Sequence, residues 1–526
     1  MRADLAYANV GHLVQRAGES YGDCAALIDG AVNLSFVQLA EEVRRSAKAF
    51  IAAGVDHGDR VAIWAPNSAR WVVAALGALS AGAALVPLNT RYKGAEAAYA
   101  LTASRATVLV CSRGFLGSDH VAMLSDAGFD ATALAVVDLA ETSTSMDEFL
   151  TSGSGMTDAE LAERTGSITA DDLSDVMFTS GTTGRPKGAM LTHGQTLRVF
   201  DDWCDLVGLR LGDRYLIVNP FFHTFGYKAG IIACLLRGAT MFPLPVFDVD
   251  EVVTRVALDR ISVLPGPPTL FQSILNLPNR DQIDLSSLRL AITGAAVVPV
   301  EMIRRMFGEL GFETVLTGYG LTETNGTATM CRVGDPPELI AVSCGCAVPG
   351  SEIRVVRPDG SDVVTGEAGE VLVRGYQVMV GYLDDPLSTA ATIDRDGWLR
   401  TGDIGVMDEN GYLRITDRLK DMLIVGGFNV YPAEIEQAMA HHPGVGQVAV
   451  VATHDERMGE VGVAYIVQRS GVELDLNELQ SWCRGTMANF KVPRHFLIVD
   501  ALPVNASGKV DKLDLRERAR ALGDTG

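Results

Sequence analysis

The sequence has few positive charges, few aromatic residues and no long uninterrupted hydrophobic run. Lys and Arg number 44 against 65 Asp and Glu, which gives a formal net charge of -21. Because a nucleic-acid-binding protein normally presents a basic face, this balance argues against DNA or RNA as a partner. The longest apolar run, residues 71–88, is rich in alanine and contains two glycines, a serine and a proline. It therefore predicts a buried helix and a buried strand, with no integral membrane segment.

Cysteines are also few, and none of them is clustered. Eight are scattered between Cys24 and Cys483, and the closest pair, Cys344 and Cys346, has no matching His or Cys group nearby. This pattern excludes zinc-ligand spacing and a disulfide framework, and it indicates a reducing compartment. The N-terminus also lacks the basic and then apolar segments of a secretory signal, so we expect a cytoplasmic protein.

The chain of 526 residues is too long for a single core, so at least two folding units are expected. Helix and strand patterns alternate in its first part; one helix begins at Ser35, with a capping box to Gln38, and ends at Gly54. The predicted strands are residues 60–64, 84–87 and 107–111. This alternation predicts an α/β fold with parallel strands. The Ser/Thr-rich residues 141–158 are expected to form a surface connector.

The pattern of predicted elements changes between residues 345 and 417. Short β runs alternate there with Asp-Gly and Gly-Glu turns, which predicts a small antiparallel barrel or sheet. We place a domain boundary near Arg418, giving a large domain, residues 1–417, and a small mixed α+β cap, residues 418–526. The cap holds 12 Lys and Arg against 14 Asp and Glu. A nearly neutral cap beside an acidic large domain suits approach to bound phosphates.

The stretch "FTSGTTGRPKG", residues 178–188, combines glycines, hydroxyls and cations. A Walker loop is excluded, because Pro186 precedes Lys187 and Gly188 stands where the metal-binding hydroxyl would be. A plain surface loop remains possible, but glycines let backbone amides form an anion-binding nest beside the hydroxyls. We therefore predict a phosphate-binding loop. Its candidate residues are Thr179, Ser180, Gly181, Thr182, Thr183, Gly184 and Lys187.

Six further stretches complete the pattern. They are "FFHTFG" (221–226), "ITGAA" (292–296), "TGYGLTET" (317–324), "GWLRTGDIG" (397–405), "TDRLKD" (416–421) and "PVNASGK" (503–509). Each alone has an ordinary structural interpretation, such as a packed histidine or a tight turn. In this order, with the loop above, they resemble the adenylate-forming superfamily of acyl-CoA synthetases, adenylation domains and luciferases. The resemblance covers about residues 21–516.

The resemblance implies both a fold and a reaction. The fold is a large N-terminal domain of two parallel-sheet α/β subdomains plus a small β-barrel, followed by a mobile cap. The reaction joins a carboxylic acid and ATP into acyl-AMP and pyrophosphate, after which the CoA thiol forms a thioester. It implies Mg²⁺ as the cofactor and ATP and CoA as co-substrates. The sequence does not decide the oligomeric state, and a homodimer is one arrangement open to the chain.

The resemblance also implies catalytic roles for Lys509, Thr322, Glu323 and His223. Thr322 would donate to the α-phosphate, Glu323 would hold Mg²⁺, and Lys509 would bridge the acid's carboxylate and the α-phosphate. Further ATP-binding positions are Gly294, Ala295, Ala296, Tyr319, Gly320, Asp403 and Arg418, the first four forming the adenine slot and the last two binding the ribose.

The acyl pocket and the CoA tunnel are implied in the same way. The acyl pocket would be lined by His223, Phe225, Tyr227, Ala295, Ala296, Gly318, Leu321 and Asn325, whose small members argue against acetate as the substrate. Tyr227 and Lys228 either reach a polar group of the acid or face solvent. Lys420 matches the family's hinge, about which the cap rotates, and Gly426 and Gly427 would line the pantetheine tunnel.

Within the superfamily, the chain is similar to bacterial fatty-acid-CoA ligases, and especially to those that act on the two-ring propanoate left by steroid breakdown. A medium- or long-chain fatty acid is the alternative substrate. Loading of a carrier protein is a second alternative, which would form AMP without a CoA thioester. A light-emitting oxygenase and an inactive relative are further alternatives, the last disfavoured because the motif residues are all in place.

Two positions qualify the resemblance. Some aryl-CoA ligases of the family carry lysine where Ile424 stands, which disfavours a close plant-type aryl ligase. The segment ending at Lys509 has the Pro, four residues, Gly-Lys arrangement that some members present to lysine acetyltransferases. Acetylation would remove the charge of Lys509 and stop adenylation.

Overall fold

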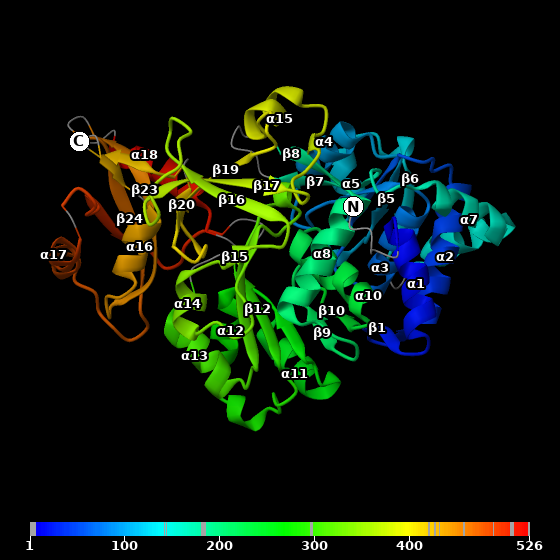
Figure 1. The fold of residues 1–526 in the computed structure, drawn as a ribbon, viewed down its shortest axis with the longest axis horizontal. Helices are drawn as coiled ribbons and strands as arrows, with labels where there is room; N and C mark the ends of the chain where they lie inside the picture. Colours follow the sequence, from blue (N-terminus) through cyan, green and yellow to red (C-terminus); the bar gives the residue numbers. More distant parts are fainter. Residues whose placement is uncertain are drawn as a thin grey trace. The chain divides into compact units, whose positions relative to one another are not determined.

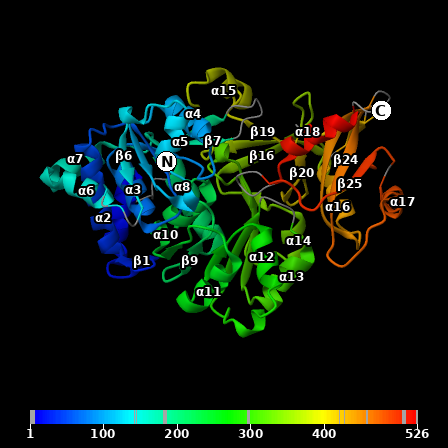
Figure 2. The same cartoon turned by 180° about the vertical axis from the view of Figure 1, so that it is seen from behind.

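The computed structural model describes residues 7–140, 143, 145–179, 186–294, 298–418, 421–425, 428–430, 432–455, 458–487, 489–504 and 510–523. Figures 1 and 2 show the fold from two opposite sides. The chain forms two compact units, Met1–Ile353 with Val373–Leu399, and Arg354–Leu372 with Arg400–Gly526. The sequence predicts a different boundary, near Arg418, beyond which the chain moves as a cap. That boundary stays a prediction.

The first unit contains a seven-stranded sheet with a parallel centre. Its strand order is β18 (Gly381–Tyr382), β8 (Lys187–Thr192), β7 (Leu173–Thr179), β4 (Ala84–Pro87), β3 (Arg60–Trp64), β5 (Val108–Cys111) and β6 (Ala135–Asp138). Strands β7, β4, β3, β5 and β6 are parallel, whereas β8 returns antiparallel to β7. Strands β3, β4 and β5 are nearly continuous runs of buried residues, as expected for parallel strands covered on both faces.

A second sheet of the same unit has nine strands. Its order is β15 (Cys346–Ala347), β14 (Thr329–Met330), β13 (Thr314–Tyr319), β12 (Leu290–Gly294), β11 (Val263–Pro265), β9 (Arg214–Ile217), β10 (Thr240–Pro243), β1 (Ala25–Asp29) and β2 (Val32–Ser35). Strands β13, β12, β11, β9, β10 and β1 are parallel. The predicted α/β class with parallel sheets is confirmed.

Helices pack around both sheets of the first unit. They include α1 (Val10–Tyr21), α2 (Phe36–Ala52), α3 (Ala69–Ser80), α4 (Gly94–Ser104), α5 (His120–Asp126), α8 (His193–Val207), α10 (Ala233–Arg237), α11 (Val249–Asp259), α12 (Pro268–Leu275), α13 (Val300–Glu309), α14 (Pro337–Val342) and α15 (Pro386–Thr392). The predicted capping box of Ser35 with Gln38 forms at α2, and Thr192 forms a second one with Gln195 at α8. Every residue of α3 except Arg70 is buried, which explains its alanine-rich composition.

The expectation of a plain connector at residues 141–158 is wrong. Helix α6 (Ser145–Ser152) lies within it, with Met146 and Leu150 buried. The Phe149 ring packs edge-on against Phe50 of α2, with 4.8 Å between the ring centroids. Three apolar residues at helical spacing thus outweigh the Ser/Thr-rich composition on which the expectation depended.

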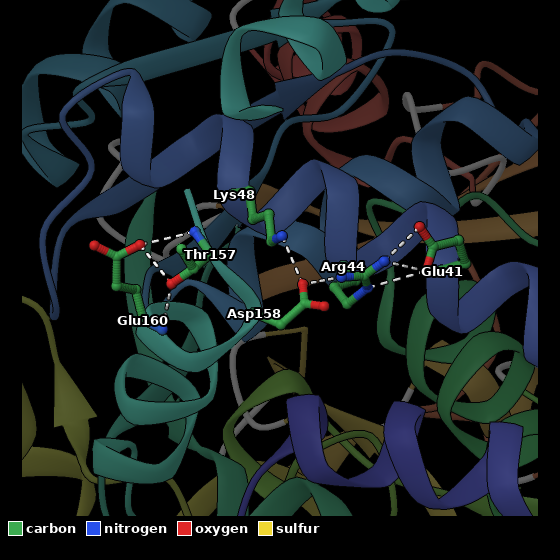
Figure 3. Close-up of polar contacts among 6 residues, drawn as sticks. All are labelled: Glu41, Arg44, Lys48, Thr157, Asp158 and Glu160. Atoms are coloured by element: carbon green, nitrogen blue, oxygen red, sulfur yellow. Dashed lines mark hydrogen bonds and ion pairs between the residues drawn. The ribbon is translucent and has the colours of Figure 1, made fainter. Parts of the chain in front are cut away.

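Charged side chains link α2 to α7 (Asp158–Ser167) at the surface (Figure 3). Asp158 contacts Arg44 and lies 2.6 Å from the Lys48 ammonium, while Arg44 also pairs with Glu41. The Thr157 and Glu160 side chains form the capping box at the start of α7. Because each ion pair includes at least one exposed carboxylate, each contributes at most about 1 kcal/mol to stability.

A four-stranded sheet follows in the chain, where the sequence predicts a small barrel. Its order is β16 (Ser351–Val356), β17 (Ala368–Gly375), β19 (Leu399–Met407) and β20 (Leu413–Arg418). The second unit holds a five-stranded sheet of β22 (Phe428–Val430), β21 (Leu423–Val425), β24 (Gly459–Gln468), β23 (Val445–Asp455) and β25 (His495–Ile498), with helices α16 (Pro432–Met439), α17 (Leu476–Thr486) and α18 (Lys512–Gly523). Among the helices described, none is long and apolar enough to span a bilayer.

A buried histidine opens helix α8. His193 is fully buried, and its Nδ1 accepts the backbone N–H of Val10 at 3.3 Å. Loss of water around the ring lowers the pKa of His193 to about 3. Its unfolded pKa is about 6.5, so its contribution to stability is complete above pH 6.5 and is lost at about 1.4 kcal/mol per pH unit as the pH falls toward 3.

The lowered pKa of His193 predicts that the natural protein loses more stability at low pH than the variant His193→Asn does. We expect Tm to fall more steeply between pH 7 and pH 5 for the natural protein than for His193→Asn. Asparagine can accept the same hydrogen bond but does not titrate in this range. Thermal melts in matched buffers would measure both slopes. Equal slopes would show that His193 is not the group that titrates.

Candidate functional site

The predicted phosphate loop connects the two strands of a hairpin. Strand β7 ends at Thr179 and β8 begins at Lys187, and these two residues are register partners. The Lys187 ammonium donates to Ser388 Oγ at 2.8 Å and lies 5.1 Å from the centre of the Tyr382 ring. The Tyr99 hydroxyl donates to the Pro186 carbonyl at 3.2 Å. The end of the loop at Pro186 and Lys187 is thereby anchored.

A carboxylate lies directly beside this hairpin. Glu323 belongs to the short 3-10 helix η6 (Thr322–Thr324), and its Oε1 accepts the Tyr382 hydroxyl at 2.9 Å. Thr179 Oγ1 lies 3.4 Å from the same oxygen. Burial and the neighbouring Glu323 raise the pKa of Tyr382 above its usual range, so the phenol remains a hydrogen-bond donor. Thr322 begins the same turn, so the structure brings Thr179, Thr322 and Glu323 together.

Glycines leave space at the carboxyl ends of β12 and β13. Gly294 and Gly318 are register partners, and a Cβ on Gly294 would lie 2.9 Å from the Gly318 carbonyl oxygen. A Cβ on Gly320 would lie 2.3 Å from the Gly326 carbonyl oxygen, so the turn before Thr322 accommodates only glycine in this conformation. Tyr319 is half-buried and packs with Met177 and Leu191 in one apolar cluster. Ligands commonly bind at this end of parallel strands.

The second unit brings two further predicted residues together. Asp403 in β19 and Arg418 in β20 are register partners in an antiparallel pair. Asp403 is buried, and its backbone N–H donates to Thr401 Oγ1 at 3.1 Å. The two residues proposed to bind ribose hydroxyls are therefore neighbours across two strands.

Three candidate acyl-pocket residues lie at helix α9 (Thr224–Gly226) and the π-helix η4 (Tyr227–Ile232), namely His223, Phe225 and Tyr227. His223 is exposed, and its Nδ1 accepts the N–H of Phe225 at 3.1 Å, which leaves Nε2 as the donor of a neutral ring. Phe225, Gly318 and Leu321 are half-buried, whereas Tyr227 and Asn325 are buried.

The solvent-facing alternative for Tyr227 and Lys228 is wrong. Both side chains are fully buried, and the Lys228 ammonium lies 2.9 Å from Asp175 Oδ1. Burial lowers the pKa of Lys228, and the Asp175 carboxylate opposes that change. The sequence contains one signal for this pair, which is a single lysine within the apolar run after Gly226. Tyr382 was also missed, and no local pattern marks it.

Several predicted site residues lie outside the described part of the chain. They are Ser180, Gly181, Thr182, Thr183, Gly184, Ala295, Ala296, Lys420, Gly426, Gly427 and Lys509. The backbone of Arg418 is described, but its side chain is not. The roles of these residues stay predictions.

The chemistry of the Glu323 region fits Mg²⁺ held mainly by phosphates. Glu323 supplies one carboxylate, with the Thr179 and Tyr382 hydroxyls beside it. No three His, Cys, Asp or Glu side chains form a metal-binding group within the described ranges. Mg²⁺ characteristically uses one or two carboxylates and takes its other ligands from water and nucleotide phosphates.

The sequence and the fold of this chain are similar to those of known proteins. A sequence model described as "AMP-binding enzyme" matches residues 14–383, and one described as "AMP-binding enzyme C-terminal domain" matches residues 434–509. The chain is 50% identical over 522 residues to the "3-[(3aS,4S,7aS)-7a-methyl-1,5-dioxo-octahydro-1H-inden-4-yl]propanoyl:CoA ligase" of Rhodococcus jostii (strain RHA1), covering 96% of this chain and 98% of that protein.

Two further matches agree with these. An enzyme of the same name from Mycobacterium tuberculosis (strain ATCC 25618 / H37Rv) is 49% identical over 496 residues, which is 94% of this chain and 96% of that protein. The fold is similar to that of o-succinylbenzoate CoA synthetase (MenE) from Bacillus subtilis in complex with its acyl-adenylate intermediate. The TM-score is 0.80, with 27% identity over 97% of this chain and 98% of that one.

Proposed function

We infer the reaction from one premise: the chain belongs to the AMP-binding enzyme family and is an ATP-dependent acyl-CoA ligase. We propose that its acid is the two-ring methyl-dioxo-octahydroindenyl propanoate named in the two relatives, an intermediate of steroid catabolism. The observation that carries this proposal is 50% identity spread over 96% of the chain.

We propose that charge neutralisation and positioning carry the first half-reaction. The acid's carboxylate attacks the α-phosphorus of ATP, so two anions must approach each other. Thr322 donates to the α-phosphate, the loop between Thr179 and Lys187 receives the β- and γ-phosphates, and Lys509 bridges the carboxylate and the α-phosphate. Bound Mg²⁺ at Glu323 would neutralise phosphate charge. Asp403 and Arg418 hold the ribose hydroxyls, and Gly294, Ala295, Ala296, Tyr319 and Gly320 receive the adenine.

The second half-reaction forms the thioester. The CoA sulfur attacks the acyl carbonyl carbon and AMP leaves with the bonding electrons. We propose that the residues after the hinge at Lys420 rotate between the two steps, withdrawing Lys509 and presenting Gly426 and Gly427 to the pantetheine arm. The acid's rings occupy a pocket lined by His223, Phe225, Tyr227, Gly318, Leu321 and Asn325.

Three finer proposals concern the compartment, the oligomeric state and the covalent modification of the enzyme. The protein works in the cytoplasm, where ATP and CoA are available, and two copies form a homodimer. A lysine acetyltransferase modifies Lys509, which would remove the ammonium needed for adenylation. Size-exclusion chromatography with light scattering tests the dimer, and mass spectrometry of protein from its native cell tests the modification.

A panel of acids tests the substrate. Thioester formation with Mg²⁺-ATP and CoA would be measured for the ring propanoate, straight-chain fatty acids of several lengths and aryl acids. We expect the highest kcat/KM for the ring propanoate. A higher value for a straight-chain acid would replace it as the substrate, and AMP release without any CoA thioester would indicate a carrier-protein loader.

A further inference from the structure

A fully buried lysine lies beside the turn that carries Thr322 and Glu323. The Lys228 ammonium pairs with Asp175 Oδ1 at 2.9 Å and donates to Asn325 Oδ1 at 2.7 Å and to Thr196 Oγ1 at 3.1 Å. An ammonium has three hydrogens and no acceptor. Three protein oxygens thus surround the ammonium, which is fully buried.

The partners of Lys228 are themselves fixed by further hydrogen bonds. The second carboxylate oxygen of Asp175 accepts Ser174 Oγ at 2.7 Å. The Asn325 side-chain amide donates to Thr196 Oγ1 at 3.3 Å, so its oxygen must face the ammonium. Asn325 has a backbone φ of 57°, a left-handed conformation that asparagine tolerates better than most residues. These contacts therefore fix the position and orientation of the Asn325 side chain.

This network joins the same two segments that meet at the candidate site. Asp175 belongs to strand β7, which ends at Thr179, and Asn325 ends the turn that contains Thr322 and Glu323. At the other end of the junction, Thr179 Oγ1 lies 3.4 Å from Glu323 Oε1. The strand and the turn are thus connected at two points, one at the phosphate side and one in the buried interior.

We propose that Lys228 is a positioning residue for adenylation, which holds the Thr322–Glu323 turn in register with the phosphate loop through Asn325 and Asp175. The inference rests on the roles proposed above for Thr322 and Glu323. Loss of this tether impairs productive binding of Mg²⁺-ATP. It leaves the reaction of acyl-AMP with CoA largely intact, because that step no longer involves the β- and γ-phosphates.

The decisive variant removes both charges at once. Lys228→Met alone would leave the Asp175 carboxylate buried and unpaired, which destabilises the fold and confuses the result. The double variant Lys228→Met with Asp175→Asn removes the ion pair and leaves no buried, unpaired charge. Thr196→Val is an independent second variant, since valine keeps the branched side chain and removes the hydroxyl that both Lys228 and Asn325 contact.

The measurement separates the two half-reactions. Pyrophosphate exchange gives KM for Mg²⁺-ATP, and thioester formation from synthetic acyl-AMP and CoA reports the second step. We expect KM for Mg²⁺-ATP to rise about tenfold in both variants, as for loss of a hydrogen bond to a charged group, with the second step within about twofold of the natural enzyme. We also expect Mg²⁺-ATP to raise Tm less than it does in the natural enzyme.

A matched control pair lies at the opposite end of strand β12. Arg289 donates to buried Asp213 through Nε at 2.7 Å, and Arg289→Met with Asp213→Asn also removes a buried ion pair. This control should lower Tm without changing KM for Mg²⁺-ATP. A folded Lys228 double variant or Thr196→Val with an unchanged KM would overturn the proposal, as would an equal loss in both half-reactions. An unchanged Mg²⁺-ATP dependence in Glu323→Gln would instead contradict the proposed role of Glu323.

Discussion

Lys509→Ala is expected to slow acyl-AMP formation about a hundredfold or more, while preformed acyl-AMP still reacts with CoA. The lysine is proposed to place its ammonium between two anions in the transition state, and loss of one such preorganised donor typically has an effect of about this size. The described residues on either side of 505–509 pair with each other. Val504 and Val510 form an antiparallel bridge, and the Asp511 N–H donates to the Pro503 carbonyl at 2.8 Å.

Pyrophosphate exchange and thiolysis of synthetic acyl-AMP would measure the two steps separately. Lys512→Ala provides the control, because Lys512 is close in sequence but pairs with Glu436 at 2.8 Å. The control should keep both rates within about threefold, as is usual when a half-exposed ion pair is removed. Equal losses of both steps in Lys509→Ala would indicate a structural role and contradict the assignment.

Glu323→Gln is expected to lower kcat/KM for Mg²⁺-ATP about a hundredfold. Glutamine retains the size of the side chain and an oxygen that can accept from Tyr382 and Thr179. It lacks the negative charge that a hard divalent cation requires. The difference should shrink as the Mg²⁺ concentration is raised at fixed ATP, and a Mg²⁺ titration of pyrophosphate exchange would measure it.

The control for this prediction is Tyr382→Phe. It removes the 2.9 Å hydrogen bond to Glu323 but leaves the carboxylate in place. Because a hydrogen bond to a charged group is worth about 1.5–3 kcal/mol, we expect a smaller loss of about tenfold. If Tyr382→Phe is more damaging than Glu323→Gln, the hydroxyl and not the carboxylate is the important group.

The sequence predicts local structure well where a few neighbouring residues decide it. The capping boxes at Ser35 and Thr192 form because each side chain bonds to backbone only three residues away. The buried strands that the sequence predicts at residues 60–64 and 84–87 have the same bounds in the structure. Motifs such as "TGYGLTET" identify a turn that requires glycine, and its steric reason is visible at Gly320.

The interactions that the sequence does not reveal are those between distant segments. Lys228 pairs with Asp175, and Glu323 accepts from Tyr382, across long stretches of chain. Strand order and packing decide which distant residues come into contact, and the local spacing of residue types does not predict either. Helix α6 was missed for a related reason, because its helical pattern becomes decisive only where Met146 and Leu150 are buried in the folded unit.

Identification of the products from ATP tests the central claim most directly. The protein would be incubated with Mg²⁺-ATP and the ring propanoate, with and without CoA, and the nucleotide and acyl products would be separated by chromatography and identified by mass spectrometry. An adenylate-forming ligase predicts AMP and pyrophosphate in amounts equal to the thioester, and enzyme-bound acyl-AMP when CoA is omitted. Formation of ADP and phosphate with the thioester would contradict the account.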